Sequence, residues 1–411
     1  MINRILLTLF INFLISPFVN ATEQYPDWSI KGFGSFGYIT TDTNSLGFVR
    51  NRTQTQSITK SGGITTDSRL GVQLDVDFNQ SLHATVQWIA RDHGGDFLEQ
   101  NLEWAFLRWH PFHDIDLRVG RLAMDTFLVS DYRNVGFAYP WMRPSHDFYA
   151  NLSTYHVDGL DISKRFSIDS DYLTLKFFAG YGMNHFPTAL GLFEMDMPMS
   201  GISLSYESNN WLTRVVYNFQ RFVTEVPNEE LTSVLNNPNF NNFLPNISSL
   251  TPHVSLKDTN LHYVSLGTRY DDATWLIHAE ASYLNSQTSL IGETVSGYLS
   301  IGRRFSNLTL YSVYGIAHGF HSNVDIPDPV VADPALLNLQ ASLDVAINNN
   351  SPKQQSFSLG ARWDVHPKIA LKTQWSHYWF GNNGAVYWRH LEDGNKPDQV
   401  NVWSVGVDFI F

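Results

Sequence analysis

The sequence contains no cysteine, and it contains only one long run of hydrophobic residues. Without cysteine, disulfides and thiol redox chemistry are excluded, so a chain of 411 residues must be stabilised by other means. The hydrophobic run lies at the N-terminus, and elsewhere polar residues interrupt the apolar ones within a few positions. No later stretch reaches the roughly 20 apolar residues that a membrane-spanning helix requires.

Positive charge is also scarce, with 27 Lys and Arg against 39 Asp and Glu and a net charge of −12. An acidic chain without a basic cluster is a poor nucleic-acid binder, so we expect no nucleic-acid partner. The 15 histidines are scattered, and His110 and His113 have no obvious third ligand nearby. We therefore expect no metal site and no cofactor.

The N-terminal run extends from Ile5 to Val19, preceded by Arg4 and followed by Val19-Asn20-Ala21. Small residues at the last and third-last positions are typical of a signal-peptide cleavage site. We predict a signal peptide over residues 1–21 and a mature chain over 22–411. The alternative, a membrane anchor, is disfavoured because the run is too short to span a bilayer and Pro17 interrupts it.

The last stretch, Val400 to Phe411, alternates strictly between two kinds of residue. One set, from Trp403 to Phe411, is apolar with aromatic ends, and the other contains Ser404, Gly406 and Asp408. Successive residues of a strand point to opposite faces, so this strand has one apolar and one small or polar face. Such a strand, ending on an aromatic residue, suits the closing strand of a transmembrane barrel.

Alternation of this kind recurs along the chain and predicts sixteen strands. Short connections, near Gln80 for example, alternate with usually longer external loops, among them 183–200, a pattern that an up-and-down membrane barrel produces. Aromatic residues make up 14% of the chain, as aromatic girdles would require. We predict an all-β, transmembrane, antiparallel up-and-down barrel with both ends at the short-turn side. Residues 228–237 and 334–347 are expected to form short helices within long loops.

A barrel of about sixteen strands leaves an aqueous channel that only a loop can narrow, because no plug domain precedes the first strand. The candidate is the third external loop, Asp125 to Tyr155, which contains seven Phe, Tyr and Trp residues between Phe127 and Tyr149. So many aromatics are unusual in an exposed loop. We expect the loop to fold inward and narrow the lumen, with sugar contacts as one use of the aromatics. Packing on the barrel wall or on a neighbouring subunit is the alternative.

If the turn centres on Gln80, paired residues sum to about 160 and Arg69 lies opposite Arg91. Two arginines facing each other repel, so they require carboxylates or an anion between them. Arg118 or Arg121 would join them from a later strand. An acidic loop facing this basic wall would sort solutes by charge. Alternatively, the arginines are solvated lumen residues paired with nearby acids such as Glu103, Glu280, Asp161 and Asp75.

Three stretches resemble the sixteen-stranded outer-membrane porins of Gram-negative bacteria. They are "DSRLGVQLDVDFNQSLHATVQW", with its Ser-Arg-Leu-Gly start, "LRVGR" before the long third loop, and the C-terminal "VGVDFIF". The resemblance implies a diffusion channel for small hydrophilic solutes, embedded in outer-membrane lipid, with a possible homotrimeric assembly. It implies Arg69, Arg91 and Arg121 as the basic wall, with Asp125 and Asp131 as loop acids. The family's Pro-Glu-Phe-Gly loop motif is replaced here by "AYPWMRP".

Two other classes of barrel remain as alternatives. An outer-membrane lipid hydrolase needs a Ser nucleophile and a His base within hydrogen-bond reach, and His321-Ser322-Asn323 contains these residue types. Adjacent strand residues point to opposite faces, which disfavours that use, and we expect no enzyme and no catalytic residues. A ligand-binding or adhesin barrel would use the long loops 223–259 and 321–355.

Overall fold

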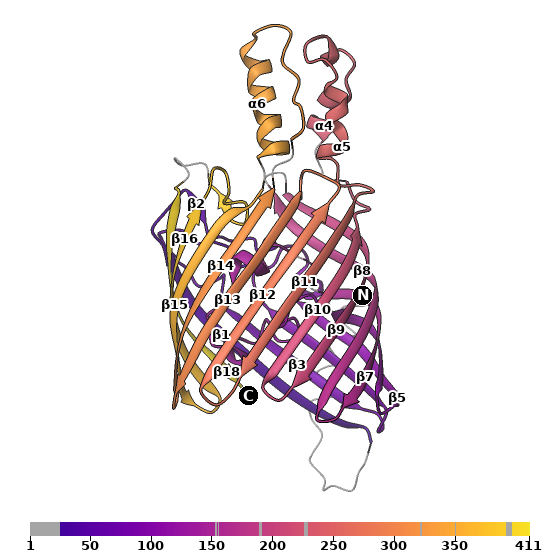
Figure 1. The fold of residues 1–411 in the computed structure, drawn as a ribbon, viewed down its shortest axis with the longest axis vertical. Helices are drawn as coiled ribbons and strands as arrows, with labels where there is room; N and C mark the ends of the chain where they lie inside the picture. Colours follow the sequence, from indigo (N-terminus) through magenta and orange to yellow (C-terminus); the bar gives the residue numbers. More distant parts are fainter. Residues whose placement is uncertain are drawn as a thin grey trace, which may run out of the picture.

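The computed structural model describes residues 25–152, 154, 156–188, 191–225, 229–320, 323–349, 351–391 and 397–411. In these residues, sixteen antiparallel strands form one closed barrel, in which each strand pairs with its neighbours in sequence order and β18 closes against β1 (Figure 1). The barrel strands are β1 (Asp27–Thr41), β3 (Arg69–Asp77), β4 (Leu82–Ala90), β5 (Leu102–Phe112), β6 (Ile115–Ala123), β7 (His156–Ile168), β8 (Asp171–Thr188), β9 (Gly191–Ser208), β10 (Trp211–Arg221), β11 (Asn260–Asp271), β12 (Trp275–Ser286), β13 (Glu293–Phe305), β14 (Leu308–Phe320), β15 (Lys353–His366), β16 (Ile369–Phe380) and β18 (Gln399–Ile410). The predicted fold class and strand number are confirmed.

The closing strand has the predicted two faces. Trp403 and Val405 are 44% and 55% exposed on the outer face, whereas Ser404 and Asp408 are 4% and 6% exposed on the inner face. At the seam, the rings of Phe409 and Phe411 cover Gly34 and Gly32 of β1, where an added methyl group would lie 2.4 Å and 2.0 Å from them. The glycines of β1 therefore make room for the aromatic end of β18.

Exposed aromatic residues gather at both rims of the outer face. Near the short turns the exposed set includes Trp28, Phe78, Trp109, Phe112, Phe166, Trp211, Trp275, Phe305 and Trp363. Near the other rim it includes Tyr38, Tyr181, Tyr283, Phe320, Trp379 and Trp403. Exposed Leu, Val and Ile side chains fill the band between these two girdles. This is the surface of a membrane-spanning barrel, with amphipathic rings at the two interfaces.

One predicted loop is wrong. Residues 183–200 were expected to form an external loop, but β8 continues to Thr188 and β9 begins at Gly191, with pairs such as Met183↔Asp196 extending the hairpin. The alternation simply continues there, because Asn184 and Met197 are buried on the inner side of the hairpin. A separate two-stranded sheet joins two other loops, where β2 (Leu46–Gly47) pairs with β17 (Arg389–His390).

Helices lie only in the connections of the described chain. They are α2 (Phe97–Gln100), η1 (Gly136–Ala138), α3 (His146–Tyr149), α4 (Glu229–Asn236), η2 (Phe240–Asn242), η3 (Ile247–Leu250), α5 (Thr251–Val254) and α6 (Pro334–Asn348). The two loop helices expected from the sequence are thus present. α4, α5 and α6 protrude from the rim opposite the short turns (Figure 1) and share an apolar cluster that includes Leu235, Leu250 and Leu343.

No helix among the described residues is long and apolar enough to cross a membrane. The proposed signal peptide, residues 1–21, lies outside the described residues, so that boundary stays a prediction.

Candidate pore site

Segment 124–152, which connects β6 to β7, is almost entirely buried. Among its residues only Asp131 and Ala138 are exposed. Its polar contacts reach inward-facing side chains of β3, β5, β8, β9, β10, β11, β12, β13, β15, β16 and β18. The segment is therefore held by side chains that project into the barrel interior from nearly all round the wall.

The first contact region centres on Glu280 of β12. Its carboxylate accepts hydrogen bonds from the backbone N–H of Leu128 (2.8 Å) and from the hydroxyls of Tyr149 (2.5 Å) and Tyr298 (2.8 Å). Leu128 and Tyr149 lie at opposite ends of segment 124–152, so one carboxylate joins both ends to the wall. Three donors compensate for the burial of an acid that is 4% exposed.

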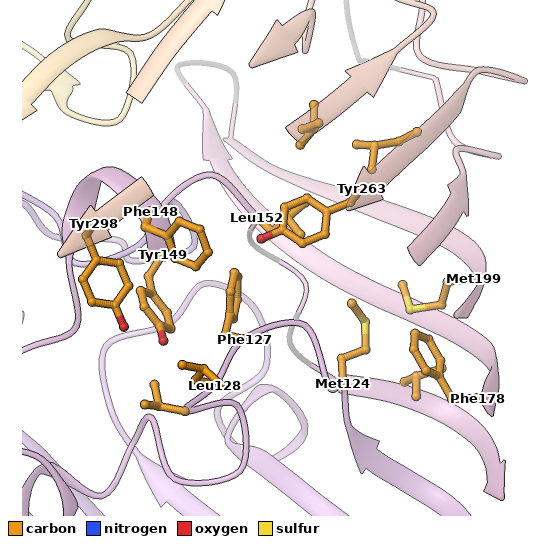
Figure 2. Close-up of a cluster of buried hydrophobic side chains, with 14 of the residues drawn as sticks. Met124, Phe127, Leu128, Phe148, Tyr149, Leu152, Phe178, Met199, Tyr263 and Tyr298 are labelled. Carbon is orange, nitrogen blue, oxygen red and sulfur yellow. The ribbon is translucent and has the colours of Figure 1, made fainter. Parts of the chain in front are cut away.

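The tyrosines that bind this carboxylate, Tyr149 and Tyr298, belong to a cluster of buried side chains (Figure 2). Phe127 lies 5.5 Å from Phe148 and 4.6 Å from Tyr149, measured between ring centroids, and 6.3 Å from Tyr263 of β11. Met124 packs in the same cluster, as do Phe178 and Met199 of neighbouring strands. We name Glu280, Tyr298, Tyr263, Phe127, Phe148 and Tyr149 the tyrosine anchor.

A second contact region lies where the segment meets β16 and β18. The ammonium group of Lys372 donates to the carbonyl oxygens of Gly136 (2.6 Å), Tyr139 (2.7 Å) and Trp141 (2.9 Å), and it forms an ion pair with Asp408 (2.7 Å). A lysine has three donors, and here a compact turn of backbone supplies acceptors to it. The ion pair is buried, so breaking it would leave an uncompensated charge.

Five arginines and two carboxylates lie next to this turn, and we name them the arginine cluster: Arg50, Arg69, Arg91, Arg133, Arg143, Asp67 and Glu103. Asp67 pairs with Arg143 (2.5 Å) and Arg50 (3.6 Å), and Glu103 pairs with Arg91 (2.8 Å) and Arg133 (2.6 Å). The hydroxyl of Tyr139 accepts from Arg50 (3.0 Å) and Arg69 (3.4 Å) and donates to the carbonyl of Arg133 (3.0 Å). The cluster carries three more positive than negative charges.

The expected juxtaposition of Arg69 and Arg91 is present. Paired residues of β3 and β4 have numbers that sum to 160, as in Leu70↔Ala90. Arg69 and Arg91 occupy the next pair of positions in this register, at the end of the hairpin away from its turn. Of the two, Arg91 pairs with a carboxylate, Glu103 (2.8 Å), whereas Arg69 donates to the hydroxyl of Tyr139 (3.4 Å).

Burial alone would raise the pKa of Asp67, but the guanidinium groups of Arg143, Arg50 and Arg69 together outweigh burial and hold that pKa below its ordinary value. Arg143 also donates to the hydroxyl of Ser404 (2.7 Å), so segment 124–152, the connection between β1 and β3, and β18 meet at this pair. Both partners are only 2% exposed in their side chains. The pair is ionised and desolvated, which makes each partner dependent on the other.

The two predicted loop acids lie elsewhere. Asp125 pairs with Lys176 of β8 (2.7 Å) and lies 3.9 Å from Arg214 of β10, and Lys176 lowers its pKa despite burial. Asp131 is exposed and forms no ion pair with a described residue. The structure therefore does not bring Asp125 or Asp131 into ion-pair contact with Arg69 or Arg91.

Arg121 does not join the cluster. It shares its strand face with Val119, which is 49% exposed, and it pairs with Asp158 (2.7 Å) next to the exposed Leu160. That face is the outer one, so the prediction that Arg121 belongs to the inner wall is wrong. Adjacent strand residues point to opposite faces, so an error of one residue places a side chain on the wrong face. Arg118 is the inward-facing arginine of β6, and it binds Asp161 through a pair 2.5 Å long.

Sequence reasoning missed Arg50, Arg133, Arg143 and Asp67. Arg133 and Arg143 stand in the same aromatic-rich stretch that drew attention to the loop, so their presence beside the aromatics was an available signal. Arg50 and Asp67 lie in the connection between β1 and β3, where no periodicity predicts which side chains face inward.

The alternative catalytic set, His321-Ser322-Asn323, begins with two residues that lie outside the described chain. The described residues contain no group of three or more His, Cys, Asp or Glu side chains that could hold a metal ion.

No family profile and no curated protein matches the sequence. Solved structures do match the fold. An anion-selective porin from Comamonas acidovorans aligns with a TM-score of 0.52 at 12% identity, covering 94% of this chain and 99% of that one. OmpF of Salmonella typhi, solved with daunomycin, gives 0.52 at 10% identity with 94% and 98% coverage. The outer-membrane channel DcaP of Acinetobacter baumannii gives 0.52 at 12% identity with 95% and 99% coverage. The chain thus has the fold of Gram-negative outer-membrane porins.

Proposed function

We propose that this protein is a diffusion channel of the Gram-negative outer membrane that passes small hydrophilic solutes. The observation that carries the proposal is the contrast between the two faces of the closed barrel. The outer face is a band of exposed apolar side chains between aromatic girdles, whereas the arginine cluster and its acids are enclosed on the inner side. A sixteen-stranded wall is wide enough for an aqueous lumen. The similar folds of proteins described as porins and channels support the same use.

In this proposal, segment 124–152 narrows the lumen, and the arginine cluster sets charge selectivity at the narrowing. A group of fixed charges in a low-dielectric wall attracts ions of the opposite sign, so three excess positive charges favour anions. The protein carries out no covalent chemistry, and a cleaved signal peptide exports it. Assembly as a homotrimer stays a prediction.

The test is the conductance of the purified, refolded protein in planar lipid bilayers. Discrete single-channel steps in KCl, with a reversal potential that shows preference for chloride, are expected. Bilayers that stay closed while the same preparation is folded, as judged by its heat-modifiable migration on a gel, would contradict the proposal. Hydrolysis of phospholipid by that preparation would favour the hydrolase instead.

A further inference from the structure

A cavity of about 250 Å³ lies between segment 124–152 and the short-turn ends of β11 to β15. The segment contributes Tyr132 and residues 137–140 to its lining, and the strands contribute Arg269, His278 and Arg304 among others. The cavity adjoins the arginine cluster through Tyr139, which lines the cavity and accepts hydrogen bonds from Arg50 and Arg69.

The charges that line the cavity do not balance. Arg304 pairs with Asp271 (2.6 Å), and Arg362 pairs with Asp364 (2.8 Å). Arg269 forms no ion pair with any described residue, and its one hydrogen bond, to the Tyr132 hydroxyl, is 3.5 Å long. One guanidinium charge is thus left without a carboxylate.

Hydrogen bonding in the wall is also incomplete. The Nε atom of Arg269 and the Nδ1 atom of His278 are buried and have no hydrogen-bond partner among the described residues. His278 as a whole is only 3% exposed. His278 packs edge-on against Trp141 at 4.9 Å between ring centroids. Leaving a buried polar atom without a hydrogen-bond partner costs free energy. Two such atoms belong to residues that line this cavity, and a solute bound there would supply the missing partners.

The remaining lining selects the kind of anion. Arg362 is fixed by the carbonyls of Phe137 (2.6 Å) and Tyr139 (3.0 Å), and it stacks over the Phe137 ring at 4.7 Å, so it is not available as a second free charge. One unbalanced guanidinium matches one negative charge, and its planar fork matches the two oxygens of a carboxylate. The aromatic rings of Tyr132 and Phe137 offer contact to an apolar remainder.

We propose that this cavity is a binding site for a small organic monocarboxylate, held chiefly by Arg269. The inference rests on the proposed function for its biological role, but the binding itself does not require conductance. Two measurements therefore separate the two proposals.

The first measurement is titration calorimetry of the folded protein in detergent with benzoate, phosphate and glucose as probes. Benzoate is expected to bind, phosphate more weakly and glucose not at all. Arg269→Gln is expected to weaken benzoate binding about tenfold or more, because it removes a charge-assisted hydrogen bond. The matched control is Arg303→Gln, which removes one positive charge from the outer face beside Trp275 and is expected to bind benzoate as the parent does. Equal binding by the Arg269→Gln variant, or phosphate binding tighter than benzoate, would overturn the proposal.

The second measurement is block of single-channel current by benzoate added on the short-turn side. Block by benzoate that Arg269→Gln relieves is the expected result. Should Arg269→Gln fail to fold, Arg269→Lys keeps the charge without the planar fork and is expected to show a partial, several-fold loss. Benzoate binding by a protein without conductance would refute the proposed channel and support the binding site. Conductance without benzoate binding would support the channel and refute the binding site.

Discussion

The barrel wall and segment 124–152 are held by different forces. The wall is a continuous ladder of backbone pairs, and its side chains need only alternate between apolar outside and polar inside. Segment 124–152 contains little regular structure, apart from the short η1 and α3, and depends on individual side chains that reach it from the wall. Defects in the wall should therefore lower the yield of folded barrel, and defects in the segment should change the current.

The segment itself is fixed in two chemically different ways. The arginine cluster uses buried ion pairs, of which Arg143–Asp67 is the most enclosed. The tyrosine anchor uses ring packing around a single carboxylate, Glu280. Charge holds one part and apolar burial the other, so pH and mutation should affect the two parts differently. The following predictions test this contrast, from the largest expected effect on current to the smallest.

Arg143→Gln should have the largest effect. It leaves Asp67 buried beside fewer positive charges, and breaking such a pair costs about 3–5 kcal/mol. We expect segment 124–152 to loosen, with a changed and noisier single-channel current and faster proteolysis within the segment. Arg108→Gln is the control, because its pair with Asp116 is partly exposed and worth about 0–1 kcal/mol. Equal behaviour of the two variants would show that the cluster does not hold the segment.

Glu280→Gln should have the next largest effect. An amide accepts through one oxygen only, so it cannot satisfy the three donors that converge on Glu280, and the loss is about 1–3 kcal/mol. Moderate noise in the current is expected, and hydrogen exchange should rise at Leu128. Glu293→Gln removes the charge of an exposed acceptor of the Tyr283 hydroxyl (2.6 Å) and should leave the current and the exchange at Leu128 unchanged. An unaltered exchange rate at Leu128 would remove Glu280 from the anchor.

Arg69→Glu combined with Arg91→Glu should reverse the charge preference, while Arg133 still pairs with Glu103 (2.6 Å). The cluster then has three arginines against four carboxylates, instead of five against two. The permeability ratio of K⁺ to Cl⁻, from the reversal potential in a salt gradient, should rise several-fold. Arg121→Glu changes charge on the outer face and should leave the ratio as it is. A reversal potential that stays constant in the double variant would exclude Arg69 and Arg91 from the narrowing.

Acidification should loosen the segment slightly. Burial, aided by Arg143, lowers the pKa of His146 from 6.5 to about 3. The folded state therefore resists a proton that the unfolded chain accepts, so this stabilisation is complete above pH 6.5 and declines as the pH falls toward 3. The lowered pKa of Asp67 acts in the same direction at lower pH, whereas the pKa of Asp147, raised by burial, opposes it. The protection factors of the segment's backbone amides at pH 7 and pH 5 measure the effect. In the His146→Phe variant the difference between the two pH values should be smaller.

Deletion of Phe411 should change the current least and the assembly most. Its ring covers Gly32 at the seam, so the deletion exposes the closing pair of strands. A lower yield of heat-modifiable barrel is expected, with normal conductance in the molecules that fold. Phe411→Tyr keeps the ring and should restore the yield. Altered conductance at normal yield would contradict the division between wall and segment.

The amino-acid sequence by itself determined the barrel. The period-2 alternation can be read from neighbouring residues, because successive strand residues point to opposite faces. In a barrel with an apolar outer face and a polar inner face, this pattern and the turns set the register of each strand. It therefore predicted sixteen strands, the faces of the terminal strand, the pairing of Arg69 with Arg91 and the loop helices. The sequence-based prediction failed at the β8–β9 hairpin, where the alternating pattern extends further than expected. It also assigned Arg121 to the wrong face of its strand.

Only the tertiary structure decided what touches segment 124–152. Its contacts join residues more than two hundred positions apart, such as Tyr139 with Lys372 and Arg143 with Ser404. No local period encodes such pairs, because they depend on the diameter of the closed barrel and on where each inward side chain ends. For the same reason the sequence could indicate Asp125 as a loop acid, but not that Lys176 would be its partner.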